Sequence, residues 1–184
     1  MKQNILLLAL LLFGMSNGWG KSLDIDAYDT ALRVNYNSQS LKSMQGLSGE
    51  LGLLFSEEDL DTYHVGFMVQ GDNWSKSGVF NIGIGGRFYI SNPGPYSLYA
   101  LGFGGKIRFS PAKRIGVGGY LYHAPDITST GDADRLTEAG MRIDYQVIPQ
   151  AFVYVGYRHI ESRIESGPYL ELDSHAHLGF RMLF

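Results

Sequence analysis

The last eleven residues of the chain, Ser174–Phe184, alternate between apolar and other side chains without interruption. One face carries Ala176, Leu178, Phe180, Met182 and Phe184, and the other carries His175, His177, Gly179, Arg181 and Leu183. A period of two indicates a β-strand whose faces meet different surroundings. A terminal Phe with apolar residues at every second position before it is typical of the last strand of a bacterial outer-membrane barrel, where one face meets lipid and the other meets the lumen.

The same alternation recurs along the chain and predicts ten strands. They are Ser22–Ala27, Ala31–Tyr36, Leu47–Ser56, Asp61–Gln70, Gly78–Ile90, Ser97–Phe109, Arg114–His123, Arg135–Val147, Gln150–Ile160 and Ser174–Phe184. The first two could form one irregular segment, so eight strands is the alternative, and both numbers are even, as in single-chain bacterial barrels. We therefore predict an all-β fold, an antiparallel up-and-down transmembrane β-barrel.

The face opposite the apolar one combines glycine with charged residues, which indicates a confined interior where small residues make room for long ones. In Gly78–Ile90, for example, Phe80, Ile82 and Ile84 oppose Gly83 and Arg87. The predicted lumen-facing charges and histidines are Glu50, Arg87, Lys106, Arg108, Glu138, Arg142, Asp144, Arg158, His175, His177 and Arg181, together with Asp24, Asp26 and Arg33. Both signs are present, so we expect ion pairs to fill the lumen, with Tyr120, Tyr122 and Tyr154.

One ion pair follows from the predicted register of Arg135–Val147 and Gln150–Ile160. The lumen faces of both strands are even-numbered, which favours a three-residue turn over Val147–Pro149. This turn sets Glu138 opposite Arg158 near the outer rim. A lumen filled by such pairs predicts a small conductance, and an open channel lined by glycines is the competing interpretation.

Aromatic residues mark the ends of the predicted strands, as in the two girdles of outer-membrane barrels. With the C-terminus on the periplasmic side, Phe80, Phe109, Tyr145 and Phe184 fall near the periplasmic rim, and Tyr63, Phe88, Tyr99 and Tyr157 fall near the outer rim. Short turns at Ser110–Lys113 and Ile148–Pro149 are expected on the periplasmic side. The longer segments Ala124–Asp134 and Glu161–Asp173 are expected outside, whereas the long connection Asn37–Gly46 would be periplasmic.

The N-terminus has the pattern of a secretory signal peptide. One positive charge precedes the apolar run Ile5–Met15, which is too short for a transmembrane helix, and small, turn-prone residues follow. We expect cleavage after Gly20, with Gly18 as the alternative, so that residues 21–184 form the barrel. The predicted location is the outer membrane of a Gram-negative bacterium, reached through the periplasm.

Composition excludes several classes of protein. The net charge of −3 implies no nucleic-acid partner, and no cysteine is present for a lipid anchor or a disulfide. No other segment reaches the length of a membrane helix. Glycine, 24 of 184 residues, is spread through the predicted strands and not gathered in a linker.

Three groups of motifs resemble the YfaZ family. They are Lys21-Ser22-Leu23-Asp24-Ile25-Asp26; Ala124-Pro125-Asp126 followed by Gly131-Asp132-Ala133-Asp134-Arg135; and Tyr145-Gln146-Val147-Ile148-Pro149-Gln150-Ala151 with Tyr154-Val155-Gly156-Tyr157-Arg158. The resemblance covers the whole mature chain. It implies an outer-membrane barrel of Gram-negative bacteria and no catalytic residues.

Candidate sites for chemistry are weak. His175 and His177 share a face but lack a third and fourth metal ligand, and Asp126, Asp132 and Asp134 suit Asx turns better than a calcium loop. Ser174 and His175 resemble the nucleophile and base of outer-membrane lipid A deacylases, but they face opposite sides of the strand. We expect no metal, cofactor or catalytic site.

We therefore expect a non-enzymatic barrel with a structural or narrow porin-like role. The alternatives are a barrel enzyme acting on lipid A or phospholipid, and a soluble periplasmic β-barrel that binds a ligand. The expected partners are outer-membrane lipid, lipopolysaccharide and the barrel assembly machinery, which would read Phe180, Met182 and Phe184. We expect a monomer.

Overall fold

The computed structural model describes residues 21–29, 31–38, 46–56, 61–75, 78–164, 167 and 169–184. The predicted signal peptide, residues 1–20, lies outside this range, so the expected cleavage stays a prediction. Most of the long connection Asn37–Gly46 lies outside it as well, as do all or part of four other connections.

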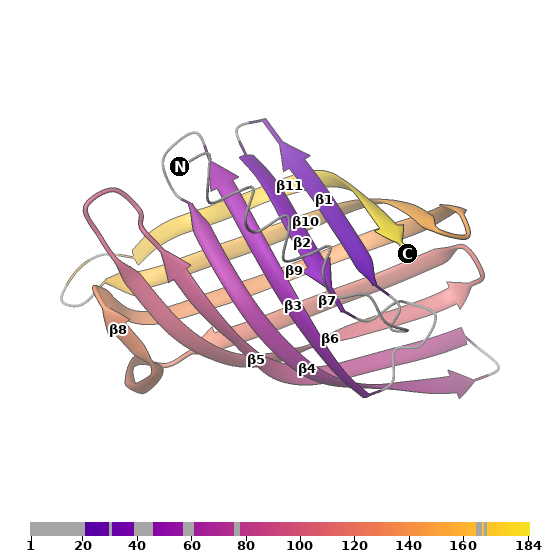
Figure 1. The fold of residues 1–184 in the computed structure, drawn as a ribbon, viewed down its shortest axis with the longest axis horizontal. Coiled ribbons are helices and arrows are strands. Elements are labelled where there is room, and N and C mark those ends of the chain that lie inside the picture. Colours follow the sequence, from indigo (N-terminus) through magenta and orange to yellow (C-terminus); the bar gives the residue numbers. More distant parts are fainter. Residues whose placement is uncertain are drawn as a thin grey trace.

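The described residues form ten barrel strands and one short additional strand (Figure 1). The barrel strands are β1 (Ser22–Tyr28), β2 (Ala31–Asn37), β3 (Gly46–Ser56), β4 (Thr62–Ser75), β5 (Gly78–Ser91), β6 (Leu98–Ala112), β7 (Ile115–Ala124), β9 (Ala133–Ile148), β10 (Ala151–Ile164) and β11 (Tyr169–Leu183). The prediction of ten strands is confirmed, and the first two are a hairpin, not one irregular segment.

Each barrel strand pairs antiparallel with its neighbour in sequence, apart from β7, whose next partner is β9. The sheet closes between the first and last strands, where Ser22 lies opposite Leu183. Backbone hydrogen bonds of 2.9 and 3.0 Å join Lys21 and Phe184 beyond this pair. The barrel therefore has no open edge between β1 and β11, which is the closure expected of a transmembrane barrel.

Several strands are longer than the sequence predicts. β4 continues past Gln70 to Ser75, and the outer segment predicted as a loop at Glu161–Asp173 contains the end of β10 and the start of β11. The predicted loop Ala124–Asp134 contains a short 3₁₀ helix, η1 (Asp126–Thr128), and strand β8 (Ser129–Gly131), which pairs with β6. These extensions lack strict apolar alternation because no lipid constrains either face beyond the membrane.

The connections differ in length between the two ends of the barrel. At the end that holds Lys21 and Phe184, the turns after β6 and β9 each contain two residues, whereas the connection from Asn37 of β2 to Gly46 of β3 is longer. At the opposite end the chain between β5 and β6 is longer, and the β7–β9 connection forms η1 and β8, seen at the left of Figure 1. Outer-membrane barrels have short periplasmic turns and longer external loops. The chain ends therefore mark the periplasmic end, and β8 marks the outer end.

The exterior of the barrel is an apolar band. Ile84 and Leu178 are 72% and 71% exposed, and outward-facing residues of the other strands, such as Phe103 and Ile143, are also exposed. Near the periplasmic end Phe80 stacks on Phe109, with ring centroids 4.4 Å apart. No helix in the described ranges is long and apolar enough to cross a membrane. An apolar exterior on a closed sheet is stable in lipid, and the protein is an outer-membrane β-barrel.

Candidate functional site

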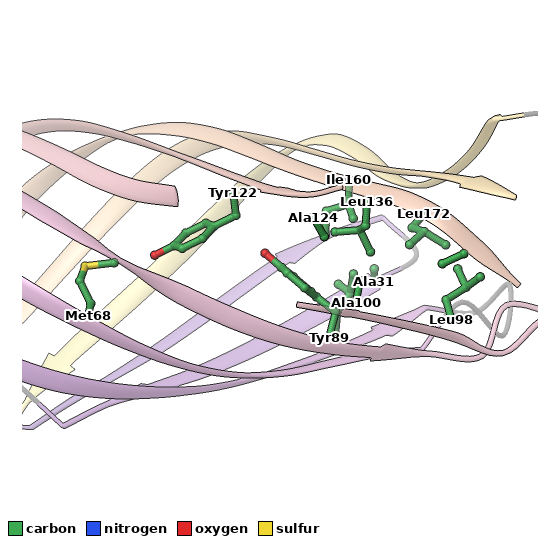
Figure 2. Packing of buried hydrophobic residues seen from close by; sticks show 12 residues of the cluster. Ala31, Met68, Tyr89, Leu98, Ala100, Tyr122, Ala124, Leu136, Ile160 and Leu172 are labelled. Atoms are coloured by element: carbon green, nitrogen blue, oxygen red, sulfur yellow. The ribbon is translucent and has the colours of Figure 1, made fainter. Parts of the chain in front are cut away.

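The outer half of the lumen is filled by apolar side chains, which we call the outer plug (Figure 2). Its members are buried and come from the outer ends of seven strands; they are Ala31, Leu54, Leu98, Ala100, Ala124, Ala133, Leu136, Ile160 and Leu172. Leu98, Ala100 and Leu136 are at most 1% exposed. Ion pairs and tyrosines were predicted to fill the lumen, and an apolar plug was not predicted.

Two tyrosines join the plug to the polar middle of the lumen. In Figure 2 the hydroxyl groups of Tyr89 and Tyr122 point away from Leu136 and Leu172. The hydroxyl of Tyr89 donates to a carboxylate oxygen of Glu138 at 2.7 Å. The ring of Tyr122 lies 4.0 Å from the guanidinium carbon of Arg87, close enough for a cation–π interaction.

Glu138 is the centre of the ionic cluster in the middle of the barrel. Its side chain is fully buried and accepts hydrogen bonds from Arg33 at 3.0 Å and from Arg87 at 2.6 Å, besides that from Tyr89. Arg87 also bonds to Glu50, which accepts a second bond from Lys106 at 2.6 Å. Buried charges need such pairing, because desolvation of an isolated ion is expensive.

A second group of ion pairs lies closer to the periplasmic end. Asp24 of β1 accepts from Arg142 at 3.1 Å and from Arg181 at 2.6 and 2.7 Å. Asp144 is bonded by both Nε and one terminal nitrogen of Arg108. These contacts link β1, β6, β9 and β11 across the lumen.

The third group contains Arg158. Its guanidinium bonds to Asp26 at 2.8 Å and also to Asp173. Asp26 accepts a further bond from the hydroxyl of Tyr154 at 3.1 Å. Asp173 is not among the predicted lumen charges, because it fell in the predicted loop Glu161–Asp173, one residue before the predicted start of the last strand.

The predicted pair of Glu138 with Arg158 is wrong. Glu138 lies opposite Ile160, and Arg158 lies opposite Gly140, so the register differs from the predicted one by two residues. The chain turns over two residues, Pro149 and Gln150, and a bulge follows at Ala151/Phe152. Pro149 favours the first central position of such a turn because its φ is fixed, and the bulge restores even parity.

His175 and His177 have separate surroundings. The side chain of His175 is 52% exposed, stacks on Tyr28 with centroids 4.2 Å apart, and contacts Asp173 at 3.2 Å. His177 is buried deeper in the barrel, edge-on to Tyr154. In the described part of the chain, no group of three or more His, Asp or Glu side chains is arranged to hold a metal ion.

The three aspartates of the β7–β9 connection each have their own partner. Asp126 accepts from the backbone amide of Ile127, Asp132 accepts from that of Ser97, and Asp134 contacts Arg163 at 3.4 Å. They stabilise local loop structure and do not converge on one point.

The outer rim brings together four polar side chains that were not connected in the predictions from sequence. Ser174 of β11 lies opposite His159 of β10, and its Oγ is 3.1 Å from His159 Nδ1. His159 Nε2 is 3.4 Å from the carboxylate of Glu161, and the hydroxyl of Tyr157 is 2.8 Å from Ser174 Oγ. Ser174 and His175 lie on opposite faces of β11, and the histidine that contacts Ser174 is His159 of β10. Only the register between β10 and β11 could have indicated the contact of Ser174 with His159.

The periplasmic half of the lumen contains a cavity of about 120 Å³, here called the periplasmic cavity. Its lining includes Asp24, Lys106, Arg142, His177 and Arg181. A second hollow of about 220 Å³ lies at the periplasmic mouth between the β6–β7 and β9–β10 turns. Arg108 lines both spaces.

The C-terminal residues predicted as an insertion signal face outward from β11. Phe180, Met182 and Phe184 are exposed, in alternation with the buried Arg181 and Leu183. They form the outer face of the strand that closes the barrel.

Comparison with solved structures gives distant likenesses to outer-membrane proteins. The outer membrane channel DcaP of Acinetobacter baumannii is 12% identical, with a TM-score of 0.46 over 88% of this chain and 54% of that one, so this chain spans about half its length. A KdgM porin is 10% identical, with a TM-score of 0.45 over 90% and 99% of the two chains. OmpT of Vibrio cholerae is 11% identical, with a TM-score of 0.40 over 84% and 56%. Likeness this distant implies no activity or substrate.

No curated protein matches the chain in sequence. The family model described as YfaZ precursor matches residues 8–177, which include all barrel strands but the end of β11. This match agrees with the resemblance drawn from the sequence motifs. The chain belongs to the YfaZ family.

Proposed function

We propose that this barrel is a non-enzymatic structural protein of the outer membrane whose lumen does not conduct. The observation that carries the proposal is the outer plug. Leu98, Ala100 and Leu136 pack in the outer half of the lumen, and the ionic cluster around Glu138 lies directly beneath them.

A plug of this kind opposes the passage of ions for two reasons. Packed apolar side chains offer an ion no replacement for its hydration shell, and such constrictions also exclude water. The charges below the plug are bonded to one another, as in the contacts of Glu138 with Arg33 and Arg87, so they are not arranged as an open charged ring. A narrow porin-like conduit would require at least the plug to open.

The test is single-channel recording from the purified protein in planar lipid bilayers. The wild type is expected to give no resolvable steps, whereas Leu98→Ser combined with Leu136→Ser should give them by admitting water to the plug. Leu121→Ser is the matched control, because Leu121 is 56% exposed on the lipid face. Large, regular steps from the wild type would reject the closed barrel in favour of the porin-like role.

We extend the proposal to the expected partners. The exposed apolar band suits lipid and lipopolysaccharide, and the outward face of Phe180, Met182 and Phe184 is available to the barrel assembly machinery during insertion. A closed sheet has no edge through which a second copy could add strands, which supports a monomer.

A second candidate function, hydrolysis of a lipid ester, is favoured by the rim contact of Ser174 with His159. Ser174 would be the nucleophile, His159 the base and Glu161 the carboxylate that orients the base. The contact of His159 with Ser174 is 3.1 Å and that with Glu161 is 3.4 Å. In this reaction Ser174 Oγ would take the acyl group, His159 would pass the proton to the leaving alcohol, and water would release the acid. This function ranks second because polar side chains at a membrane interface also form hydrogen bonds simply to satisfy their donors and acceptors.

The two candidates are distinguished by an ester assay. Purified protein in phosphatidylcholine vesicles would be tested for release of fatty acid, with Ser174→Ala and with Ser129→Ala as the control. Release that is lost in Ser174→Ala and retained in the control would establish the enzyme and overturn the non-enzymatic proposal. The proposal predicts no release from any of the three proteins.

A further inference from the structure

The carboxylates around the periplasmic cavity are already saturated with cations. Asp24 is bonded by Arg142 and Arg181, and Glu50 is bonded by Arg87 and Lys106. The Asp24 and Glu50 side chains are 3% and 8% exposed, so they offer little surface to a ligand.

Two cations, in contrast, keep part of their surface in the cavity. The side chains of Lys106 and Arg142 are 28% and 29% exposed. Among the described residues, Lys106 uses one of its three N–H groups, on Glu50, and Arg142 uses one of its five, on Asp24. The cavity wall therefore presents more hydrogen-bond donors than acceptors.

The two cations belong to the wall of one cavity, Lys106 from β6 and Arg142 from β9. A negative group between them would offset their like charges.

The route into the cavity is also basic. Lys113 and Arg114 are exposed at the periplasmic mouth, where they line the second hollow, and Arg108, which is paired with Asp144, lies between that hollow and the cavity. At the outer end the plug closes the lumen. The positive potential of Lys113 and Arg114 would therefore favour the approach of an anion from the periplasm.

We propose that the periplasmic cavity binds a small oxyanion, a phosphate or a carboxylate, between Lys106 and Arg142. The cavity volume of about 120 Å³ is large enough for a small oxyanion. The site is reached from the periplasm and does not depend on conduction, so it goes beyond the closed barrel.

In the first experiment, inorganic phosphate is titrated into the folded barrel in detergent at constant ionic strength. The heat of binding is measured by calorimetry. Saturable binding is expected for the wild type. Lys106→Gln and Arg142→Gln should each weaken it about tenfold or more, since a hydrogen bond to a charged group contributes on this scale. Arg163→Gln, at the outer end, is the control and should bind as the wild type does. Acetate in place of phosphate tests the carboxylate class.

The second experiment needs no variant, which protects the test if a variant fails to fold. Wild-type protein is treated with an amine-acetylating reagent with and without phosphate, and labelling is read by mass spectrometry. Phosphate should protect Lys106 but leave the exposed Lys113 unchanged. Equal labelling of Lys106 in both conditions, or binding that chloride reproduces or that neither substitution weakens, would overturn the proposal.

Discussion

Replacing Glu138 by Gln tests the ionic cluster, because it removes a negative charge and keeps the size of the side chain. The carboxylate is 0% exposed and accepts three hydrogen bonds, from Arg33 at 3.0 Å, from Arg87 at 2.6 Å and from Tyr89 at 2.7 Å. Gln has one acceptor oxygen in place of two, and its amide N–H groups would face a guanidinium.

The size of the effect depends on the hydrogen-bond partners that Arg87 and Arg33 retain after the substitution. Arg87 retains its bond to Glu50, whereas Arg33 is left with the neutral Asn35 and Tyr120. Removing one partner of a buried ion pair typically destabilises a protein by about 3–5 kcal/mol, because a charge remains buried without compensation. We expect a loss in this range for Glu138→Gln.

The assay is reversible urea unfolding of the purified barrel in lipid vesicles, with heat-modifiable gel migration as a second measure of folding. Glu171→Gln is the control, since this carboxylate is 61% exposed and lies 4.0 Å from His159, and we expect it to change the free energy of unfolding by about 1 kcal/mol or less. In the double variant Arg33→Met/Glu138→Gln the loss should be smaller than the sum of the single losses. A loss below about 1 kcal/mol for Glu138→Gln would refute the view that the cluster holds the lumen together.

Three further predictions concern the barrel wall. Phe103→Arg should destabilise the barrel by about 2–4 kcal/mol in vesicle unfolding, because it places a charge in lipid. Gly140→Arg should instead disrupt folding by crowding the lumen, where even a Cβ would lie 2.6 Å from a tyrosine ring. Equal denaturant sensitivity of the two variants would contradict this assignment of faces. Phe184→Asp should lower the folded yield in outer-membrane fractions, and an unchanged yield would count against an insertion role. Gly104→Ala should lose about 1–3 kcal/mol, since its Cβ would collide with a backbone oxygen of β7, whereas Gly71→Ala, with open space around it, should be neutral.

The strands and their faces were predictable because alternation is a local property of the chain. The pattern of Ser174–Phe184 is readable without knowledge of any other strand, and the same holds for Gly78–Ile90. The register was not predictable in the same way. The even parity of β9 and β10 was correct, but the turn at Pro149 and its adjacent bulge shifted the pairing by two residues.

The outer plug and the contact of Ser174 with His159 at the outer rim were not predictable from the sequence, for different reasons. Alternation says which face a residue occupies, not what fills the lumen at that depth, so Leu98 and Leu136 did not stand out among inward positions. The contact of Ser174 with His159 depends on the pairing of β10 with β11. His159 and Glu161 lie two residues apart on one face of β10, which indicates that they can interact. Ser174 lies on β11, so its contact with His159 is not apparent from the sequence of either strand.

The seam between β1 and β11 also has a consequence for the order of events during biogenesis. Ser22 and Leu183 belong to nearly opposite ends of the chain, so the sheet cannot close until the final residues have been synthesised and exported. Bringing such distant segments together has an entropic cost of about 4–5 kcal/mol plus a constant, and pairing at this separation is slow. Until then both edge strands have unpaired backbone groups that can join with other chains. Shielding of these two edges during periplasmic transit would therefore prevent their pairing with other chains, and closure of the β1–β11 seam ends the need for it.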